Sequence, residues 1–174
     1  MANTVRYIFM QEYKPTVIES QVFSWLETTR DLFDYNAIVS VVPPRLKHLD
    51  EKKVKEIEAK YKIKYHQVTF PNIIGIRELS LLFFILKLYF RHLGAGTLIF
   101  QSRFLLFSLI SPVISLLPKL KLVYEARGTV IVEYLYGEAA VSANAYRAWS
   151  KSLRERLTLK YSDLVISVSQ KQKD

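Results

Sequence analysis

The segment Lys121-Leu-Val-Tyr-Glu-Ala-Arg-Gly-Thr-Val-Ile-Val-Glu133 joins a short apolar run to charged residues and a glycine. Its apolar part, Leu122 to Tyr124, has the length and composition of a buried β-strand. The run ends in Glu125, Arg127 and Gly128. A buried strand that ends in charge and glycine is typical of the edge of an α/β sheet, where ligands bind beyond the carboxyl ends of the strands.

Two other apolar runs have the same form. Thr97-Leu-Ile-Phe100 ends in Gln101-Ser-Arg103, and Asp163-Leu-Val-Ile-Ser-Val-Ser169 ends in a serine. Segments of helical length separate the three runs. This alternation predicts parallel strands whose polar ends share one edge of a sheet.

Periodicity and breaker residues extend the pattern to the rest of the chain. Further strands are expected at residues 5–10, 37–42 and 64–70, and helices at about 18–33, from Asp50, and at 76–92, 104–117 and 145–160. In the last helix, Tyr146, Trp149, Leu153 and Leu157 are expected to face the core. The order βαβαβαβαβαβ predicts an α/β fold, a three-layer Rossmann-like domain with a mostly parallel, doubly wound sheet.

The composition is that of a globular protein. The chain has 174 residues, half of them hydrophobic and 24% charged, which suits a single domain with a sizeable core. It has no cysteine, and its three histidines lack the spacing of metal ligands, so no metal site is expected. The apolar stretches 79–93 and 104–117 are shorter than the roughly 20 residues of a membrane span, which favours buried or interfacial helices.

The net charge of +9 is concentrated in the second half of the chain. Such an excess suits an anionic partner: a membrane surface, a phosphorylated substrate or nucleic acid. A basic surface with no specific partner is the alternative. No motif with interleaved aromatic residues supports nucleic-acid binding, and no signal peptide is visible at the start of the sequence.

Three stretches carry a resemblance to a known family. They are Glu125-Ala-Arg-Gly128 followed by Glu133, Gln101-Ser-Arg103, and the segment from Arg154 to Ser169; Ile18-Glu-Ser-Gln-Val22 is a weaker fourth. Together they resemble the N-terminal, acceptor-binding domain of a GT-B glycosyltransferase of the family 4 type. Glu125 replaces the usual aspartate of that family, Gln101 replaces a histidine, and the first loop lacks paired glycines.

The resemblance implies half of an enzyme. In this family the C-terminal Rossmann-like domain binds the nucleotide-sugar and carries two glutamates seven residues apart, while the N-terminal domain binds the acceptor. Residues 1–174 contain only the N-terminal, acceptor-binding kind of domain, so this chain alone is expected to be inactive. The short segment after Ser169 suggests a piece of a larger protein. The family implies metal-independent, retaining transfer without a cofactor. The expected setting is bacterial surface polysaccharide synthesis on a glycan or lipid-linked acceptor, in the cytoplasm or peripherally at the inner face of the plasma membrane.

The expected catalytic residues are Arg127 and Glu133. Arg127 stays protonated, so it cannot be a base, but it can orient an anionic acceptor or the diphosphate. Alternatively it pairs with Glu125 or Glu133 to hold the loop. Glu133 either positions or deprotonates an acceptor hydroxyl or is the structural partner of Arg127. Gly128 either allows a ligand to approach the backbone or serves a structural turn.

Other residues are expected to bind substrate. Gln101, Arg103 and Glu125 would share the rim with Arg127, although Arg103 could instead form a surface salt bridge. Near the first helix, Lys14, Glu19 and Ser20 surround backbone N–H groups suited to an anion, unless Glu19 caps those groups itself. The competing function is a non-catalytic Rossmann-like module that binds anionic membrane or a protein partner.

Overall fold

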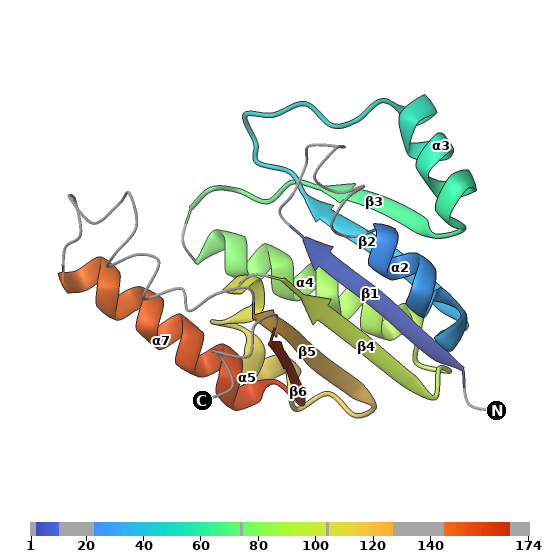
Figure 1. Ribbon diagram of the computed structural model, residues 1–174. Coiled ribbons are helices and arrows are strands. Elements are labelled where there is room, and N and C mark those ends of the chain that lie inside the picture. The colour runs from blue at the N-terminus through green and yellow to red at the C-terminus, as the bar shows by residue number, and fades with distance from the viewer. Residues whose placement is uncertain (1–2, 11–22, 74, 104, 127–144, 168–174) are drawn as a thin grey trace.

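The fold is built on one parallel β-sheet. The computed structural model describes residues 3–10, 23–73, 75–103, 105–126 and 145–167, and Figure 1 shows their arrangement. Six strands lie in the order β3-β2-β1-β4-β5-β6, and every neighbouring pair is parallel. The predicted three-layer, doubly wound Rossmann-like α/β fold is therefore confirmed.

The strands fall close to the predicted runs. They are β1 Thr4–Met10, β2 Tyr35–Val41, β3 Lys64–Val68, β4 Thr97–Ser102, β5 Leu120–Ala126 and β6 Leu164–Ser167. β1 is buried along almost its whole length because it lies between β2 and β4 at the centre of the sheet. A central parallel strand is covered on both faces, which explains the apolar run from Tyr7 to Met10.

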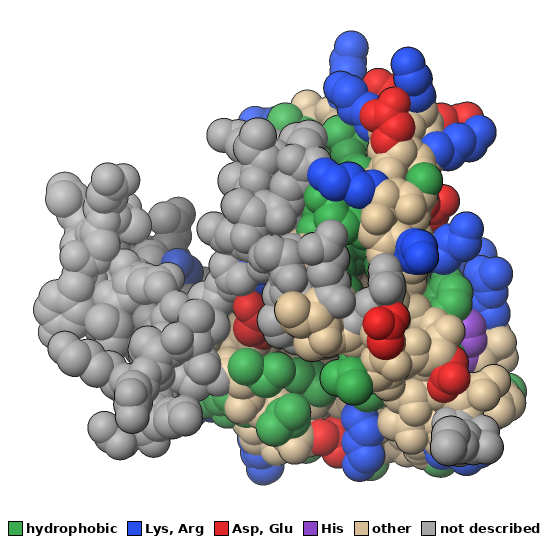
Figure 2. Space-filling view, turned by 45° about the vertical axis from the view of Figure 1, so that its right-hand side comes forward, with side chains coloured by type: hydrophobic (Ala, Val, Ile, Leu, Met, Phe, Trp, Pro, Cys, Tyr) green, Lys and Arg blue, Asp and Glu red, His purple; other side chains and the backbone are tan. Residues whose placement is uncertain are grey.

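The helices agree with the prediction in three places and differ in two. They are α2 Ser24–Thr29, α3 Glu51–Tyr61, α4 Ile76–Arg91, α5 Ser111–Ile114 and α7 Ala145–Tyr161, with 3₁₀ turns η2 at Arg30–Leu32 and η3 at Leu105–Phe107. Asp50 caps α3 by accepting a hydrogen bond from the Lys53 N–H at 2.8 Å. Figure 2 shows the mixed basic and acidic side chains of α3 gathered at the top of the molecule, as expected for a solvated helix.

The predicted helix at 104–117 was wrong. This segment is a 3₁₀ turn followed by the four-residue helix α5. Pro112 lies in the first turn of α5, where its missing N–H costs nothing, but it could not continue a helix from residue 104. The predicted helix at 18–33 is also shorter than expected: within the described part it ends at Thr29 and tightens into η2.

Helices cover both faces of the sheet. Figure 1 shows α2 and α4 on opposite sides of it. Phe23 and Leu26 pack with Ile8 and with Tyr61 at the end of α3 on one face, where the rings of Phe23 and Tyr61 stack with centroids 4.0 Å apart. On the other face α4, η3 and α5 pack against the odd-numbered residues of β1. The last helix, α7, lies against α5, η3 and β5.

The inward face of α7 is polar, which corrects the sequence-based expectation. Trp149 is 60% exposed and Leu153 36%, whereas Thr158 is buried. Arg154, on the same side of the helix as Thr158, reaches Glu78 of α4 with 3.7 Å between Nη2 and Oε1. Arg154 and Thr158 lie on the stripe next to that of Leu153 and Leu157, and this neighbouring stripe turns inward. Leu157 is half-buried, and the side chain of Tyr146 lies outside the described part of the chain.

Phe9 lies at the centre of the larger core. Its ring contacts those of Phe107, Phe100 and Phe84 edge-on, with centroids 4.8, 5.5 and 6.4 Å apart. We expect Phe9→Ala to lower the free energy of unfolding by about 3–5 kcal/mol, because it removes a fully buried ring and leaves a cavity. Leu116→Ala, at a side chain that is 81% exposed, is the control and should change it by less than about 0.5 kcal/mol. Urea denaturation of both variants measures this, and equal effects would contradict the packing described.

A cluster of histidine and tyrosine lies against the same face of the sheet. The hydroxyl of the fully buried Tyr7 and Nε2 of His92 are hydrogen-bonded at 2.8 Å, and the ring of His66 stacks near Tyr7. Burial lowers the pKa of both histidines, and the positive charge of Arg91 acts in the same direction. Burial also raises the pKa of Tyr7. The folded protein therefore favours the neutral forms of these three side chains.

Stability should consequently fall as the pH falls below about 6.5. Below that pH the unfolded chain, whose histidines keep ordinary pKa values, binds more protons than the folded protein, so protonation favours unfolding. Urea denaturation between about pH 7.5 and pH 5 measures the slope. The double variant His66→Gln, His92→Gln should show a flatter profile over this range. An unchanged profile in that variant would assign the pH dependence to other groups.

Candidate functional site

All six strands run in the same direction, so their carboxyl ends meet at one edge of the sheet. This is the edge where Rossmann-like folds bind ligands, next to the point where the strand order reverses. That point lies between β1 and β4. The N–H of Arg103 donates to the carbonyl of Phe9 at 3.4 Å, which continues the β1–β4 ladder one residue past β4 and places Arg103 at the reversal.

Three of the predicted site residues meet there. Glu125 lies near the end of β5, with its Oε1 3.4 Å from Nε of Arg103 and its Oε2 accepting a hydrogen bond from Nε2 of Gln101 at 3.3 Å. Gln101 and Glu125 reach one another because Gln101 pairs with Val123, two residues before Glu125 on the same side of the sheet. The motifs at the ends of β4 and β5 therefore form one cluster.

Burial makes this cluster more than a surface ion pair. The side chain of Arg103 is only 2% exposed and that of Glu125 14%. A guanidinium this deep needs a neutralising partner, because an isolated buried charge is very costly. The bidentate fork of an arginine and the oxygens of a carboxylate are also the groups that bind phosphate and sugar hydroxyls. The arrangement can thus hold the rim together and orient a polar ligand.

A pocket of about 620 Å³ opens on the same edge, beyond the ends of β2 and β3. Its walls are apolar at Val42, Phe70 and Leu106, and it is bordered by Arg45 and Arg77. Arg45 is exposed and makes no ion pair with any residue that the structure describes. Sequence reasoning missed both arginines. The available signal was the prolines at 43–44 and 71, which stop the two strands just before the pocket.

Glu78 fixes the wall of this pocket. Its carboxylate contacts Nη2 of Arg77 at 2.6 Å and accepts the N–H of Gly75 at 2.7 Å. Burial alone would raise the pKa of Glu78, but these hydrogen bonds and the charge of Arg77 outweigh it, so its pKa is lowered. Gly75 has φ of 88°, a backbone conformation that favours glycine, and it begins α4. The buried carboxylate therefore holds Arg77 at the rim.

The third motif has a structural role at the opposite edge. Asp163 Oδ2 accepts the N–H of Leu122 at 2.8 Å, and its Oδ1 contacts Nζ of Lys121 at 2.7 Å. Burial alone would raise the pKa of Asp163, but these two hydrogen bonds lower it on balance. This aspartate joins the end of α7 to the start of β5. It contacts β5 at Lys121 and Leu122, whereas Glu125 lies near the other end of that strand.

The remaining predicted residues fall outside the described part of the chain. These are Lys14, Glu19, Ser20, Arg127, Gly128 and Glu133, together with the weaker match at 18–22 and Ser169. Arg127 directly follows the last described residue of β5, one position after Ala126. Among the residues with described positions, no group of three or more histidine or acidic side chains could hold a metal ion.

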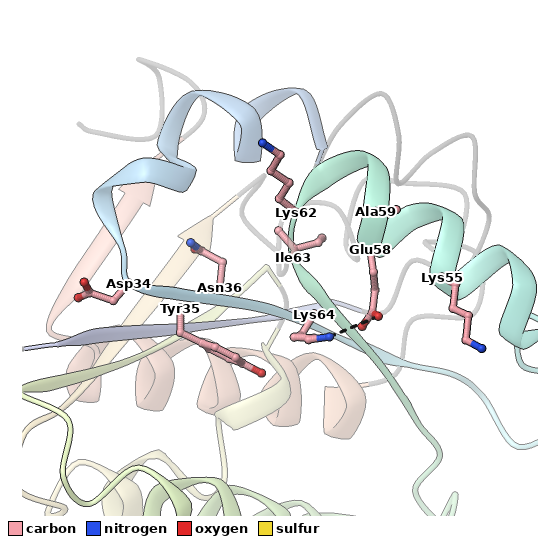
Figure 3. A pocket seen from close by; sticks show the side chains of 9 residues that line it. All are labelled: Asp34, Tyr35, Asn36, Lys55, Glu58, Ala59, Lys62, Ile63 and Lys64. Carbon is pink, nitrogen blue, oxygen red and sulfur yellow. Dashed lines mark ion pairs between the residues drawn. The ribbon is translucent and has the colours of Figure 1, made fainter.

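A second pocket, at the amino edge of the sheet, does not form a converging site. It has a volume of about 500 Å³ and lies between the start of β2 and the end of α3. Figure 3 shows Lys55 and Lys62 pointing away from each other, while Lys64 turns to Glu58 with 3.6 Å between Nζ and Oε2. The charges here diverge or cancel, so the carboxyl edge is the better candidate.

The site and fold define a Rossmann-like α/β protein with a polar cluster at its strand reversal. No family model matches the sequence, and no curated protein matches it. A solved protein of unknown function from Vibrio parahaemolyticus aligns with 97% of this chain and 94% of its own length, at 9% identity and a TM-score of 0.51. LpCGTa in complex with UDP aligns with 97% of this chain at 12% identity and a TM-score of 0.49, and this chain spans 47% of its length. At these identities the likeness concerns the fold alone.

The cluster leads to a stability prediction. Glu125→Gln keeps the size of the side chain but removes the charge beside Arg103, so we expect the free energy of unfolding to fall by about 1–3 kcal/mol. Lys121→Ala breaks an ion pair whose lysine is 57% exposed, so it should lower the free energy of unfolding by less than about 1 kcal/mol. Urea denaturation compares the two. A smaller loss for Glu125→Gln than for Lys121→Ala would show that Glu125 does not neutralise Arg103.

Proposed function

We propose that this chain is the acceptor-binding domain of a sugar-nucleotide-dependent, retaining glycosyltransferase of the GT-B, family 4 type. The observation that carries the proposal is the contact of Gln101 and Arg103 with Glu125. These residues belong to two separate stretches that resemble the family, and they lie together at the ends of adjacent parallel strands. Neither stretch alone is specific. Their contact at a ligand-binding edge is what the transferase hypothesis requires.

The proposed chemistry divides between two domains. A second Rossmann-like domain supplies the nucleotide-sugar site, and the carboxyl edge of this chain faces it. As the glycosidic bond to phosphate breaks, negative charge grows on the leaving diphosphate, and a fixed cation stabilises it. Arg127, next to Ala126 at the end of β5, is the proposed cation, and Glu133 the proposed partner of the acceptor hydroxyl. Arg103 and Glu125 hold the end of β5 in place, and the positions of Arg127 and Glu133 depend on it.

The pocket beyond β2 and β3 is the proposed acceptor subsite. Its apolar walls suit the faces of sugar rings, and the guanidinium of Arg45 suits a phosphate. We therefore favour a glycan carried on a lipid phosphate as the acceptor. Such acceptors are used at the inner face of the plasma membrane in bacterial surface polysaccharide synthesis, and we place the protein there, peripherally associated.

Binding to the chain itself tests this assignment. Saturation-transfer NMR should detect binding of sugars that are linked to a short-chain polyprenyl phosphate. UDP should bind weakly or not at all because its site belongs to the other domain. Arg45→Ala should weaken binding of the phosphate-linked glycan about tenfold, which is the loss expected for one charged hydrogen bond. Lys52→Ala, on the exposed surface of α3, is the matched loss of one positive charge and should leave affinity unchanged.

Two outcomes would overturn the proposal. Preferential binding of UDP would contradict the division between domains. Failure of every glycan to bind would favour the competing function, a non-catalytic Rossmann-like module that recruits a membrane or protein partner.

A further inference from the structure

The helix α4 is apolar on two opposite sides. Leu81, Ile85 and Leu88 are buried against the sheet. On the outer side, Ile76, Leu79, Phe83 and Phe90 are each at least half exposed, and their spacing of three, four and seven residues places them on one line. A helix that is apolar all round is expected to be covered on all sides, so its outer line calls for a partner.

Other helices of the same layer also expose apolar side chains. Val113 and Leu116, in and just after α5, are exposed, and so are Trp149 and Leu153 of α7. All three helices belong to the same layer, because α4 and α5 share one core and α7 packs on α5. The layer formed by α2 and α3 differs, since the outward side of α3 is charged rather than apolar. Among the described helices, α4, α5 and α7 therefore carry most of the large exposed apolar side chains, although Leu32 of η2 is also exposed.

Basic residues accompany this surface. Those that are exposed are Lys87, Arg91, Lys119, Arg156 and Lys160. The acidic residues of α4, α5 and α7 are only Glu78 and Glu155, and Glu78 is buried between Arg77 and Arg154. In contrast, α3 mixes glutamates with its lysines. Basic residues thus outnumber acidic ones on the described helices that expose large apolar side chains.

We propose that the outer face of α4, continued by α5 and α7, is the surface on which this protein lies against an anionic lipid bilayer. Leucine, phenylalanine and tryptophan side chains enter the boundary between head groups and acyl chains, while lysine and arginine meet the lipid phosphates. The 16 residues of α4 span about 24 Å, short of the roughly 30 Å hydrocarbon layer, so the helix lies in the interface plane. No helix in the described ranges is long and apolar enough to cross a membrane.

This orientation bears on the acceptor site. The helix α4 begins at the carboxyl edge, where Arg77 borders the rim pocket and Ile76 begins the exposed line. A bilayer against α4 therefore lies beside the pocket, within reach of a head group that remains attached to its lipid. This last step rests on the proposed function. The docking surface itself rests only on the exposed side chains and their charges.

Vesicle co-sedimentation tests the surface directly. The protein should bind vesicles of phosphatidylcholine with about a third phosphatidylglycerol and release as salt is raised, because screening weakens the phosphate contacts. The double variant Phe83→Glu, Phe90→Glu should lose at least tenfold in vesicle affinity. Leu32→Glu is the matched control: Leu32 is 72% exposed in η2. Its variant should bind as the original protein does. Circular dichroism and thermal melting check that all variants fold.

Two sets of results would overturn the inference. Failure to bind anionic vesicles, or equal losses in Leu32→Glu and in the double variant, would remove α4 as the docking face. A dimer seen by analytical ultracentrifugation and abolished by Phe83→Glu, Phe90→Glu, without vesicle binding, would assign the face to a second copy. Vesicle binding without glycan binding would leave this surface standing and refute the proposed function, so the two failures are distinguishable.

Discussion

The common direction of six hydrogen-bonded strands is the constraint on which the rest of the structure depends. Because every strand ends at the same edge, the last residues of β4 and β5 and those that follow β2 and β3 lie along that edge although they are distant in the sequence. The crossover from β3 to β4 then moves the helices to the opposite face of the sheet. One topological change thus creates both the polar rim and the separate layer of α4, α5 and α7.

Most of the strands were predictable from the sequence because each has a local cause. Residues such as Pro43 and Gln101 mark where an apolar run ends, so the strand boundaries can be read locally. Parallel pairing follows from the helix-length segments between the runs. The approach of Gln101, Arg103 and Glu125 was also predictable, since strand ends in such a sheet must share an edge. Neither inference requires any knowledge of side-chain packing.

The sequence did not reveal the features that depend on side-chain packing. The periodicity of α7 did not show that Arg154 and Thr158, rather than Trp149 and Leu153, would lie on its inner side, where Arg154 contacts Glu78. Likewise, Arg45 is an isolated arginine in the sequence, and it borders a pocket only because β2 and β3 end side by side. Contacts between segments far apart in the chain have no local signature.

The ion pair between Arg154 and Glu78 also has a consequence for biosynthesis. The two residues are separated by most of the second half of the chain, so Glu78 emerges from the ribosome long before its second arginine is made. Until then its carboxylate has Arg77 and the Gly75 N–H as its contacts. The ion pair that joins α4 to α7 therefore forms only after α7 has been translated.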